Sequence, residues 1–155
     1  MWADVPNLRH LRAFVLVAEM GGITRAAQRI HLSQPAITQA LARLDERFAT
    51  KLLEFGADGM TLTTAGTLLR DRVARALELI ETGAREALRL EARRSGGGFA
   101  RFEQLITVAQ LRSLAAVATT RNFSLAAREL GLSQPSVHRA ARDLERLTGM
   151  TMFVA

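Results

Sequence analysis

The chain repeats part of itself at an interval of 100 residues, and this repeat constrains the fold more than any other feature. Residues 32–35, Leu-Ser-Gln-Pro, recur as residues 132–135. When residues 8–55 are laid over residues 108–155, 12 of the 48 pairs are identical, and many others keep their apolar character. Repetition at a fixed interval predicts one structural module that is present twice. The 155 residues therefore favour two very small domains over a large multidomain enzyme.

Helix start and stop signals predict three helices in each copy. In the first copy, apolar residues at helical spacing predict a helix over about residues 8–20, which Gly21 and Gly22 end. A short second helix extends to about Ile30, and a third follows Ser33, with Pro35 in its first turn. The predicted N-caps are Asn7, Thr24 and Ser33, with Thr107, Ser124 and Ser133 at the matching places of the second copy.

The third helix of the first copy has one apolar side. Ile37, Leu41, Leu44 and Phe48 follow one another at spacings of 4, 3 and 4, so we expect them to be buried. The same spacing turns the polar residues at positions 38, 39 and 43 outward. The polar side of this helix is therefore free to touch a partner.

After its third helix, the first copy continues into a predicted hairpin. Two short runs, Lys51–Phe55 and Met60–Thr63, flank the glycine-bearing turn Gly56–Gly59, and this pattern is typical of a small wing. The second copy reaches only Met150–Ala155, where its own hairpin should turn. We therefore expect the second wing to be incomplete and the parent protein to continue beyond Ala155.

A long helix is predicted between the two copies, from about residue 64 to residue 94. Seven of its small or apolar residues alternate at spacings of 4 and 3, which is a heptad seam and predicts pairing with a second copy of the chain. These candidate dimerisation residues are Leu69, Val73, Ala76, Ile80, Gly83, Ala87 and Leu90. The run Ser-Gly-Gly-Gly at 95–98 then predicts a flexible joint.

Composition excludes several kinds of chemistry. The chain has no cysteine, which removes disulfides, thiolate nucleophiles and cysteine-bound zinc. No glycine-rich phosphate loop, metal-ligand spacing or nucleophile with a base stands out, so we expect no enzyme, no cofactor and no metal site. No stretch is apolar enough to predict a membrane span. The net charge of +6 makes nucleic acid a plausible partner.

Several short motifs, taken as a set, resemble the N-terminal headpiece of LysR-type transcriptional regulators. In the first copy they are Thr-Arg-Ala-Ala at 24–27, Leu-Ser-Gln-Pro-Ala-Ile at 32–37, Leu-Asp-Glu at 44–46, Leu-Thr-Thr-Ala-Gly at 62–66 and the long helix. In the second copy they are Ser-Leu-Ala-Ala at 124–127, Leu-Ser-Gln-Pro-Ser-Val at 132–137 and Leu-Glu-Arg at 144–146. The resemblance covers nearly all of residues 7–94, and the second copy up to its first wing strand.

The resemblance implies a mainly α fold in which tandem winged helix-turn-helix domains are joined by a long, coiled-coil-like dimerisation helix. The domains it implies are a first head at 1–63, a linker helix at 64–94, a flexible joint at 95–101 and a second head at 102–155 with an incomplete wing. It also implies a bacterial transcription regulator, cytoplasmic and nucleoid-associated, that binds a pseudo-palindromic double-stranded DNA operator as a homodimer. A small-molecule inducer is expected only if the parent protein carries a C-terminal effector domain.

The same resemblance assigns DNA contacts to the third helix of each head and to two flanking positions. The candidates in the first head are Arg25, Ser33, Gln34, Pro35, Thr38, Gln39, Arg43 and Lys51, and those in the second are Ser133, Gln134, Pro135, Ser136, His138, Arg139 and Arg142. Gln pairs well with adenine and Arg with guanine, so the two heads are expected to read different bases. The larger positive charge of the second head, with His138 and Arg139, predicts that it contributes more of the base readout.

Other interpretations stay open. Ser33 and Ser133 can be helix caps without touching phosphate, and the polar faces can be merely solvated. Phe55 stands where a basic residue is usual in the family, and Asp58 stands where a basic wing tip is common. The alternative function is therefore a dimerisation or protein-interaction module in which one or both heads no longer bind DNA.

Overall fold

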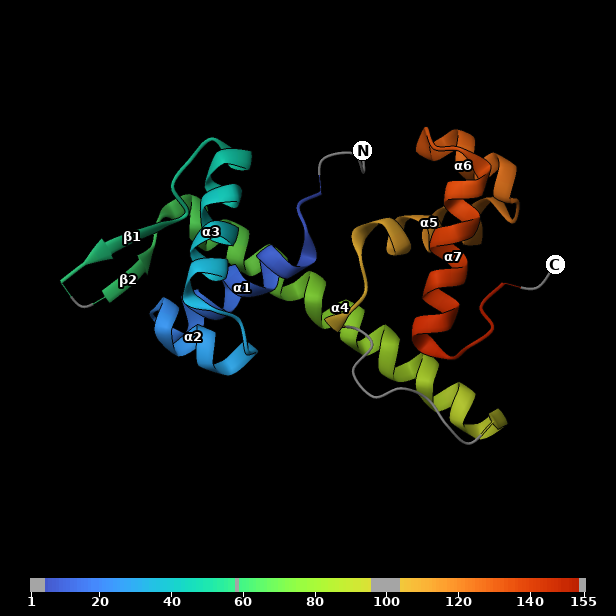
Figure 1. The fold of residues 1–155 in the computed structure, drawn as a ribbon, viewed down its shortest axis with the longest axis horizontal. Helices are drawn as coiled ribbons and strands as arrows, with labels where there is room; N and C mark the ends of the chain where they lie inside the picture. The colour runs from blue at the N-terminus through green and yellow to red at the C-terminus, as the bar shows by residue number, and fades with distance from the viewer. Residues whose placement is uncertain (1–4, 58, 96–103, 154–155) are drawn as a thin grey trace. The chain divides into compact units, whose positions relative to one another are not determined.

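The computed structural model describes residues 5–57, 59–95 and 104–153. The chain divides into two compact units, Pro6–Ile80 on the one hand and the described residues of Met1–Val5 and Glu81–Ala155 on the other. Figure 1 shows the order of the helices and strands along the chain. Each unit is described below by itself.

The first head consists of three helices and a hairpin. Its helices are α1 at Leu8–Met20, α2 at Ile23–Ile30 and α3 at Gln34–Phe48, which pack on one another around a small core. Phe14, Val17 and Ile37 have no exposed surface, and Leu44 is 1% exposed. This core holds α3 with its polar side outward.

A two-stranded antiparallel sheet follows α3, as the sequence predicts. Strand β1 at Leu53–Gly56 pairs with β2 at Gly59–Leu62, with Leu53 opposite Leu62 and Phe55 opposite Met60. In Figure 1 this hairpin projects from the three-helix core of the first head. The predicted wing of the first head is present, although its tip residue Asp58 lies outside the described residues.

Helix α4 spans Thr64–Ser95, where the periodicity predicts a long helix. Its start is fixed to the hairpin by Thr63, whose backbone N–H donates to the Leu52 carbonyl oxygen at 3.1 Å. The Thr63 hydroxyl also accepts a 2.9 Å hydrogen bond from the Gly66 N–H. Gly66 packs so closely that a Cβ atom there would lie 1.9 Å from the Leu52 carbonyl oxygen. Only Ser95 of the predicted 95–101 joint is described together with α4, and the rest lies outside the described residues.

The second head repeats the three-helix pattern. Helix α5 spans Val108–Thr120, α6 spans Phe123–Leu130 and α7 spans Gln134–Thr148, and all three pairs of these helices are in contact. Its core includes five buried residues, which are Ala116, Val117, Ala126, Ala127 and Val137. Leu144 of α7 is 1% exposed, like Leu44 at the matching place of α3.

Four of the six predicted N-caps are confirmed. Asn7, Ser33, Thr107 and Ser133 each accept a hydrogen bond from a backbone N–H in the first turn of the helix that follows. Thr24 is wrong as a cap, because α2 begins after Gly22 without a capping side chain.

Ser124 is also wrong as a cap, because the Asn122 side chain caps α6 by accepting from the Leu125 N–H at 3.0 Å. In both heads the apolar residue before the predicted cap, Ile23 or Phe123, is already helical. The second helices therefore begin one residue before their predicted caps.

Phe48 is not the core residue that its spacing predicts, because 40% of it is exposed. Helix α3 ends directly after it at Ala49, which adopts a left-handed conformation with φ of 50°. The last turn of α3 thus extends past the core. Ala40, which is 5% exposed, contributes to the buried side of α3 instead.

Helix ends in the two heads use left-handed residues at three matching positions. Gly21, Gly131 and Gly149 adopt positive φ, as do the non-glycine residues His31, Ala49 and Arg121. Positions 21 and 121, 31 and 131, and 49 and 149 are equivalent in the repeat, so each pair contains one glycine. Both heads therefore have the same backbone conformation at each of these positions. The glycine that favours it is in the first head at one position and in the second head at the other two.

Replacing Ser113 is expected to stabilise the second head. Its side chain is buried at 1% exposure, and its hydroxyl has no hydrogen-bond partner among the described residues. A buried unpaired hydroxyl costs about 1–3 kcal/mol, so Ser113→Ala is expected to raise the unfolding free energy of this head by about 1 kcal/mol. Urea unfolding followed by circular dichroism measures the change. A neutral or destabilising effect would contradict the prediction, and Ala13 at the matching place of α1 shows that alanine suits this position.

Among the described residues, no helix combines the length and the apolar character needed to cross a membrane.

Candidate nucleic-acid interface

Residues 33–36, at the start of α3, are exposed in the first head. Ser33 caps this helix by accepting the Ala36 N–H at 3.3 Å, with Pro35 in the first turn. Gln34, Thr38 and Gln39 are exposed further along the same helix. The Thr38 hydroxyl donates to the Gln34 carbonyl oxygen at 3.0 Å, so its proton is already used within the helix. Gln34 and Gln39 are therefore exposed residues of this helix whose side chains offer both an amide donor and a carbonyl acceptor.

Two further candidate cations are Arg43, on α3, and Lys51, just after α3. Arg43 is exposed on α3 and acts on His10 of α1: partial burial of the imidazole, together with the positive charge of Arg43, lowers the pKa of His10 below its ordinary value. Lys51 forms a 2.8 Å ion pair with Asp45, and 76% of its side chain is exposed. A DNA phosphate would have to compete with Asp45 for Lys51, which reduces the contribution expected of that contact.

Arg25 lies at the start of α2 and is exposed. One guanidinium nitrogen lies so close to Gly21 that it would be 3.4 Å from a Cβ atom placed there. The cationic end of Arg25 therefore lies beside the C-terminus of α1, where a positive charge interacts favourably with the helix dipole. In the second head this position is Leu125, of which 48% is exposed.

Helix α7 presents a different set of polar groups. Ser133 caps it, and the Ser133 and Ser136 hydroxyls are 2.8 Å apart. The Ser124 hydroxyl of α6 donates to the Gln134 side-chain carbonyl at 3.1 Å, which leaves the amide N–H groups of Gln134 available. Arg139 and Arg142 are exposed, as is Pro135.

His138 is the exception among the predicted DNA contacts, because it is half-buried while all the others are exposed. Its imidazole stacks on Phe123 of α6, with the ring centroids 3.9 Å apart and the planes at 10°. Phe153 leans against Phe123 at 5.6 Å and 58°. The sequence offers no signal for this contact, because Phe123 and His138 are 15 residues apart and meet only through the packing of α6 on α7.

In both heads, a carboxylate at the same position of the third helix accepts hydrogen bonds from backbone N–H groups of the segment that follows this helix. Asp45 accepts the Leu52 N–H at 3.1 Å in the first head. In the second, Glu145 accepts the N–H groups of Met152 and Phe153 at 2.9 and 3.1 Å. The motif match at 44–46 and 144–146 could have indicated this role, since it places an acidic residue at the second position of both.

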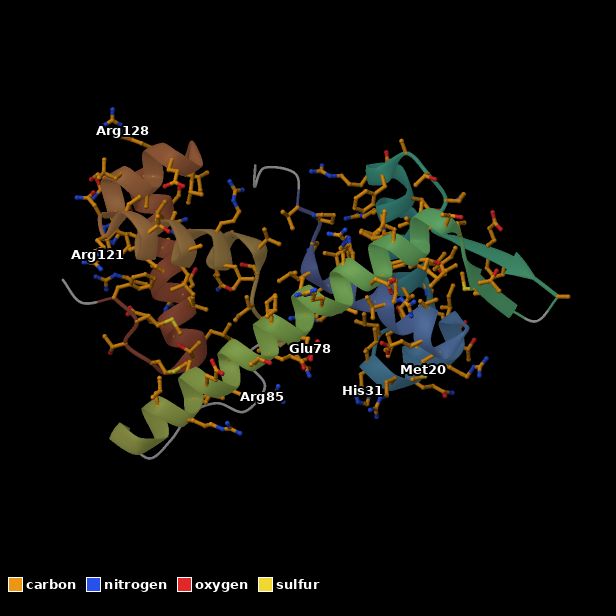
Figure 2. The ribbon with its side chains drawn as sticks, turned by 180° about the vertical axis from the view of Figure 1, so that it is seen from behind. Met20, His31, Glu78, Arg85, Arg121 and Arg128 are labelled. Atoms are coloured by element: carbon orange, nitrogen blue, oxygen red, sulfur yellow. The ribbon has the colours of Figure 1, made fainter. Side chains whose placement is uncertain are left out.

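Arginines outside the third helices also reach solvent. Arg121 ends α5 in a left-handed conformation, and Arg128 extends outward from α6 (Figure 2). His31 occupies the turn between α2 and α3. Among the described residues, no group of three or more His, Asp and Glu side chains is placed to hold a metal ion.

The wing of the first head carries an exposed aromatic residue on its first strand. Phe55 on β1 is 81% exposed and lies opposite Met60. Glu54 beside it is also exposed. The part of the wing that the structure describes thus presents an apolar side and a carboxylate, with Lys51 at its base.

The predicted dimerisation residues on α4 differ in exposure within the single chain. Val73 is buried at 7% exposure, while Ala76, Gly83 and Leu90 are exposed, and Leu69, Ile80 and Ala87 are half-buried. Two leucines outside the predicted seam, Leu68 and Leu79, are 61% and 65% exposed. Large exposed apolar residues of α4 therefore lie both inside the predicted seam, at Leu90, and outside it, at Leu68 and Leu79.

Comparison with known proteins identifies the family. The family described as "Bacterial regulatory helix-turn-helix protein, lysR family" matches residues 8–67 and again residues 108–155. The HTH-type transcriptional regulator GalR of Pseudomonas putida is 36% identical over 159 residues, covering 97% of this chain and 36% of GalR. The HTH-type transcriptional regulator TfdT of Cupriavidus pinatubonensis is 40% identical over 81 residues, covering 52% of this chain and 36% of TfdT. The chain spans little more than a third of the length of these relatives.

Solved structures agree with this relationship. The crystal structures of BenM_DBD with catB site 1 DNA and with benA site 1 DNA each match with a TM-score of 0.52 and 28% identity. Each match covers 55% of this chain, and 94% and 96% of the respective BenM_DBD chains. The fold is accordingly mainly helical with a small two-stranded sheet, as in winged helix-turn-helix domains. Since the family description matches two segments that together exceed half of the chain, the protein belongs to the LysR family of bacterial regulatory helix-turn-helix proteins.

Proposed function

We propose that this chain is the DNA-binding part of a LysR-type transcription regulator and that it carries two DNA-binding heads in tandem. In each head the third helix, α3 or α7, enters a major groove of double-stranded DNA. The observation that carries the proposal is the common start of the two helices, each with a serine cap, a proline in the first turn and exposed polar residues beyond it. Such a helix presents its N-terminal side chains to base edges and its N–H groups to phosphate.

The similarity to BenM_DBD–DNA complexes supports the same function. On this proposal the protein acts in the bacterial cytoplasm as a non-enzymatic regulator, and a two-fold symmetric assembly would recognise a pseudo-palindromic operator. An inducer is expected only if the parent protein carries a C-terminal effector domain.

Gln39→Ala and Arg139→Ala test this proposal head by head. A good contact between such a side chain and a base contributes about 1–3 kcal/mol of discrimination, so each variant is expected to lose about 5- to 150-fold in affinity for the specific site. The measurement is a fluorescence-anisotropy titration of the whole chain against duplex DNA from its own promoter and a scrambled duplex, at two salt concentrations. Specific binding should weaken steeply as the salt concentration rises.

The control for Arg139→Ala is Arg85→Ala, which removes the same charge from α4. Arg85 is exposed and donates to the Thr82 hydroxyl at 3.1 Å (Figure 2). This control should keep the specific affinity. Equal binding of promoter and scrambled DNA by the unaltered chain would contradict sequence-specific recognition, and unchanged binding by both alanine variants would show that Gln39 and Arg139 do not read bases.

We further propose that α4 pairs with α4 of a second copy. Leu68, Leu79 and Leu90 are spaced 11 residues apart, which keeps them on one side of a helix, and each is more than 60% exposed. A stripe of large apolar residues that is exposed in the single chain is typical of a surface that a partner covers in an assembly.

Leu79→Lys is expected to convert the dimer to a monomer, because it places a charge in the middle of this stripe. Glu78→Lys is the matched control: it introduces the same side chain at the neighbouring exposed position, which the helical repeat of 3.6 residues places on another side of the helix. Sedimentation equilibrium measures the mass of both variants. A dimer that survives Leu79→Lys but not Glu78→Lys would place the interface on a different face of α4.

One observation favours a second candidate function, a protein-interaction module. Phe55, at 81% exposure, stands on the wing of the first head, and Lys51 at the wing base is already paired with Asp45. A wing of this kind suits an apolar partner better than a phosphate backbone. The promoter titration separates the two candidates, since an interaction module would bind neither duplex specifically while keeping the dimer.

A further inference from the structure

A cluster of three rings in the second head has no aromatic counterpart in the first. His138 of α7 lies flat on Phe123, and Phe153 packs on the same phenyl ring; we call these three residues the aromatic cluster. The equivalent positions of the first head are Ile23, Thr38 and Leu53, none of which carries a ring. One of these differences, at His138, lies on the third helix itself.

The aromatic cluster is anchored from two sides. Phe123 and Phe153 are half-buried against the core of the second head. The segment that carries Phe153 is also held by Glu145, whose carboxylate accepts its backbone N–H at 3.1 Å. Because both phenyl rings are held by the core, the plane of the imidazole stacked on Phe123 is held as well. A side chain that is already ordered loses less conformational entropy when it forms a contact.

Among the described residues, none of the hydrogen bonds involves the His138 side chain. In contrast, the Thr38 hydroxyl at the matching position of the first head donates to the Gln34 carbonyl oxygen at 3.0 Å. The same place on the third helix thus carries a hydroxyl whose proton is used in one head and an oriented ring with an unused N–H in the other.

We propose that Phe123 and Phe153 are positioning residues that hold His138 for base recognition, so that the second head selects a guanine at a position that the first head leaves unread. This inference rests on the proposed DNA binding of the second head. A neutral imidazole has one N–H donor. Guanine offers such a donor acceptors only, at N7 and O6, whereas adenine sets a donor beside its N7 acceptor, thymine a methyl group beside O4, and cytosine exposes a donor.

The stack is tested without DNA by NMR of the whole chain. A phenyl ring stacked on an imidazole shifts the imidazole carbon-bound protons upfield. We expect this upfield shift for His138 in the unaltered chain and in Phe123→Tyr, which keeps an aromatic ring. It should disappear in Phe123→Ile, which carries the residue of the first head. A merely structural role of Phe123 would not link this spectroscopic signature to base choice.

Base choice is tested by selecting 30-base-pair duplexes from a randomised library with the same proteins and with His138→Thr. The unaltered chain and Phe123→Tyr should enrich a guanine at one position of the site. His138→Thr and Phe123→Ile should lose that preference, with about a five- to tenfold weaker affinity for the selected site, as expected for one hydrogen bond. Circular dichroism checks that each variant keeps its helices, and His138→Thr serves alone if Phe123→Ile does not fold.

The outcomes separate this inference from the function on which it rests. If the unaltered chain and His138→Thr select the same site, the inference is overturned while DNA binding stands. If Phe123→Ile loses the upfield shift but keeps the guanine, Phe123 is not a positioning residue, and that part of the inference fails. If the unaltered chain enriches no sequence, both this inference and the proposed DNA binding of the chain are overturned.

Discussion

Leu144→Ala is expected to unfold the second head while the first head stays folded. Leu144 is 1% exposed in the core of a very small unit, and removing a buried leucine side chain costs about 2–5 kcal/mol because it leaves a cavity. Small domains have little stability to lose, so this cost is comparable to the whole unfolding free energy of one head. Differential scanning calorimetry should show one transition moved to a much lower temperature and a second left in place.

The matched variant is Leu44→Ala, at the equivalent position of the first head and also 1% exposed. It should move the other transition by a similar amount. If either variant shifts both transitions together, the heads unfold as one cooperative unit, and the division of the chain into two compact units does not describe its stability.

Gly66→Ala is expected to destabilise the first head by about 2–3 kcal/mol. The added Cβ atom would lie 1.9 Å from the Leu52 carbonyl oxygen and 2.9 Å from the carbon to which that oxygen is bonded. Overpacking of this kind costs about 1–3 kcal/mol, and here the obstacle is backbone, which cannot rotate aside as a side chain can. The Leu52 carbonyl also accepts from the Thr63 N–H, so moving it weakens the junction between hairpin and α4. Urea unfolding followed by the amide signals of the first head measures the loss.

Gly83→Ala is the matched control on the same helix. No atom lies within 4 Å of a Cβ atom placed there, so alanine should stabilise the helix by about 0.5–1 kcal/mol through its better helix propensity. A Gly66→Ala protein as stable as the unaltered chain would show that the start of α4 can move away from Leu52 without cost.

The repeat and the helix signals predict much of this fold. Three helices in each copy, the hairpin at 53–62 and the extent of α4 all follow from apolar spacing, glycine turns and capping residues. Ser33 and Ser133 are correct as caps because a short polar side chain stands directly before a proline-bearing first turn. Such signals are local, and they act within a few residues of each other.

The errors concern features that depend on how helices pack. The starts of the second helices are an exception, because α6 is capped locally by Asn122, directly before Phe123, and α2 begins after Gly22 without a capping side chain. The exposure of Phe48 follows from where α3 leaves the core, which periodicity alone does not contain. Spacing likewise cannot tell that α4 covers Val73 within its own chain while leaving Leu79 exposed.

The candidate interface was predictable in outline and not in its details. Residue types on α3 and α7 indicate exposed donors and acceptors, and nearly all of the predicted DNA contacts are exposed. The engagement of Lys51 by Asp45, of Gln134 by Ser124 and of His138 by Phe123 depends on distances between elements. These contacts decide which of the predicted side chains are ready to bind and which must first exchange a partner.

The alternation of glycine at the three left-handed helix ends makes each head a natural design template for the other. A non-glycine residue in this conformation costs about 1 kcal/mol or more, and His31, Ala49 and Arg121 all carry that cost. At each matching position the other head has a glycine, which adopts this conformation without strain: Gly131, Gly149 and Gly21. A single consensus head built from both copies would thus combine all three glycines, and it would be less strained than either of the heads from which it was drawn.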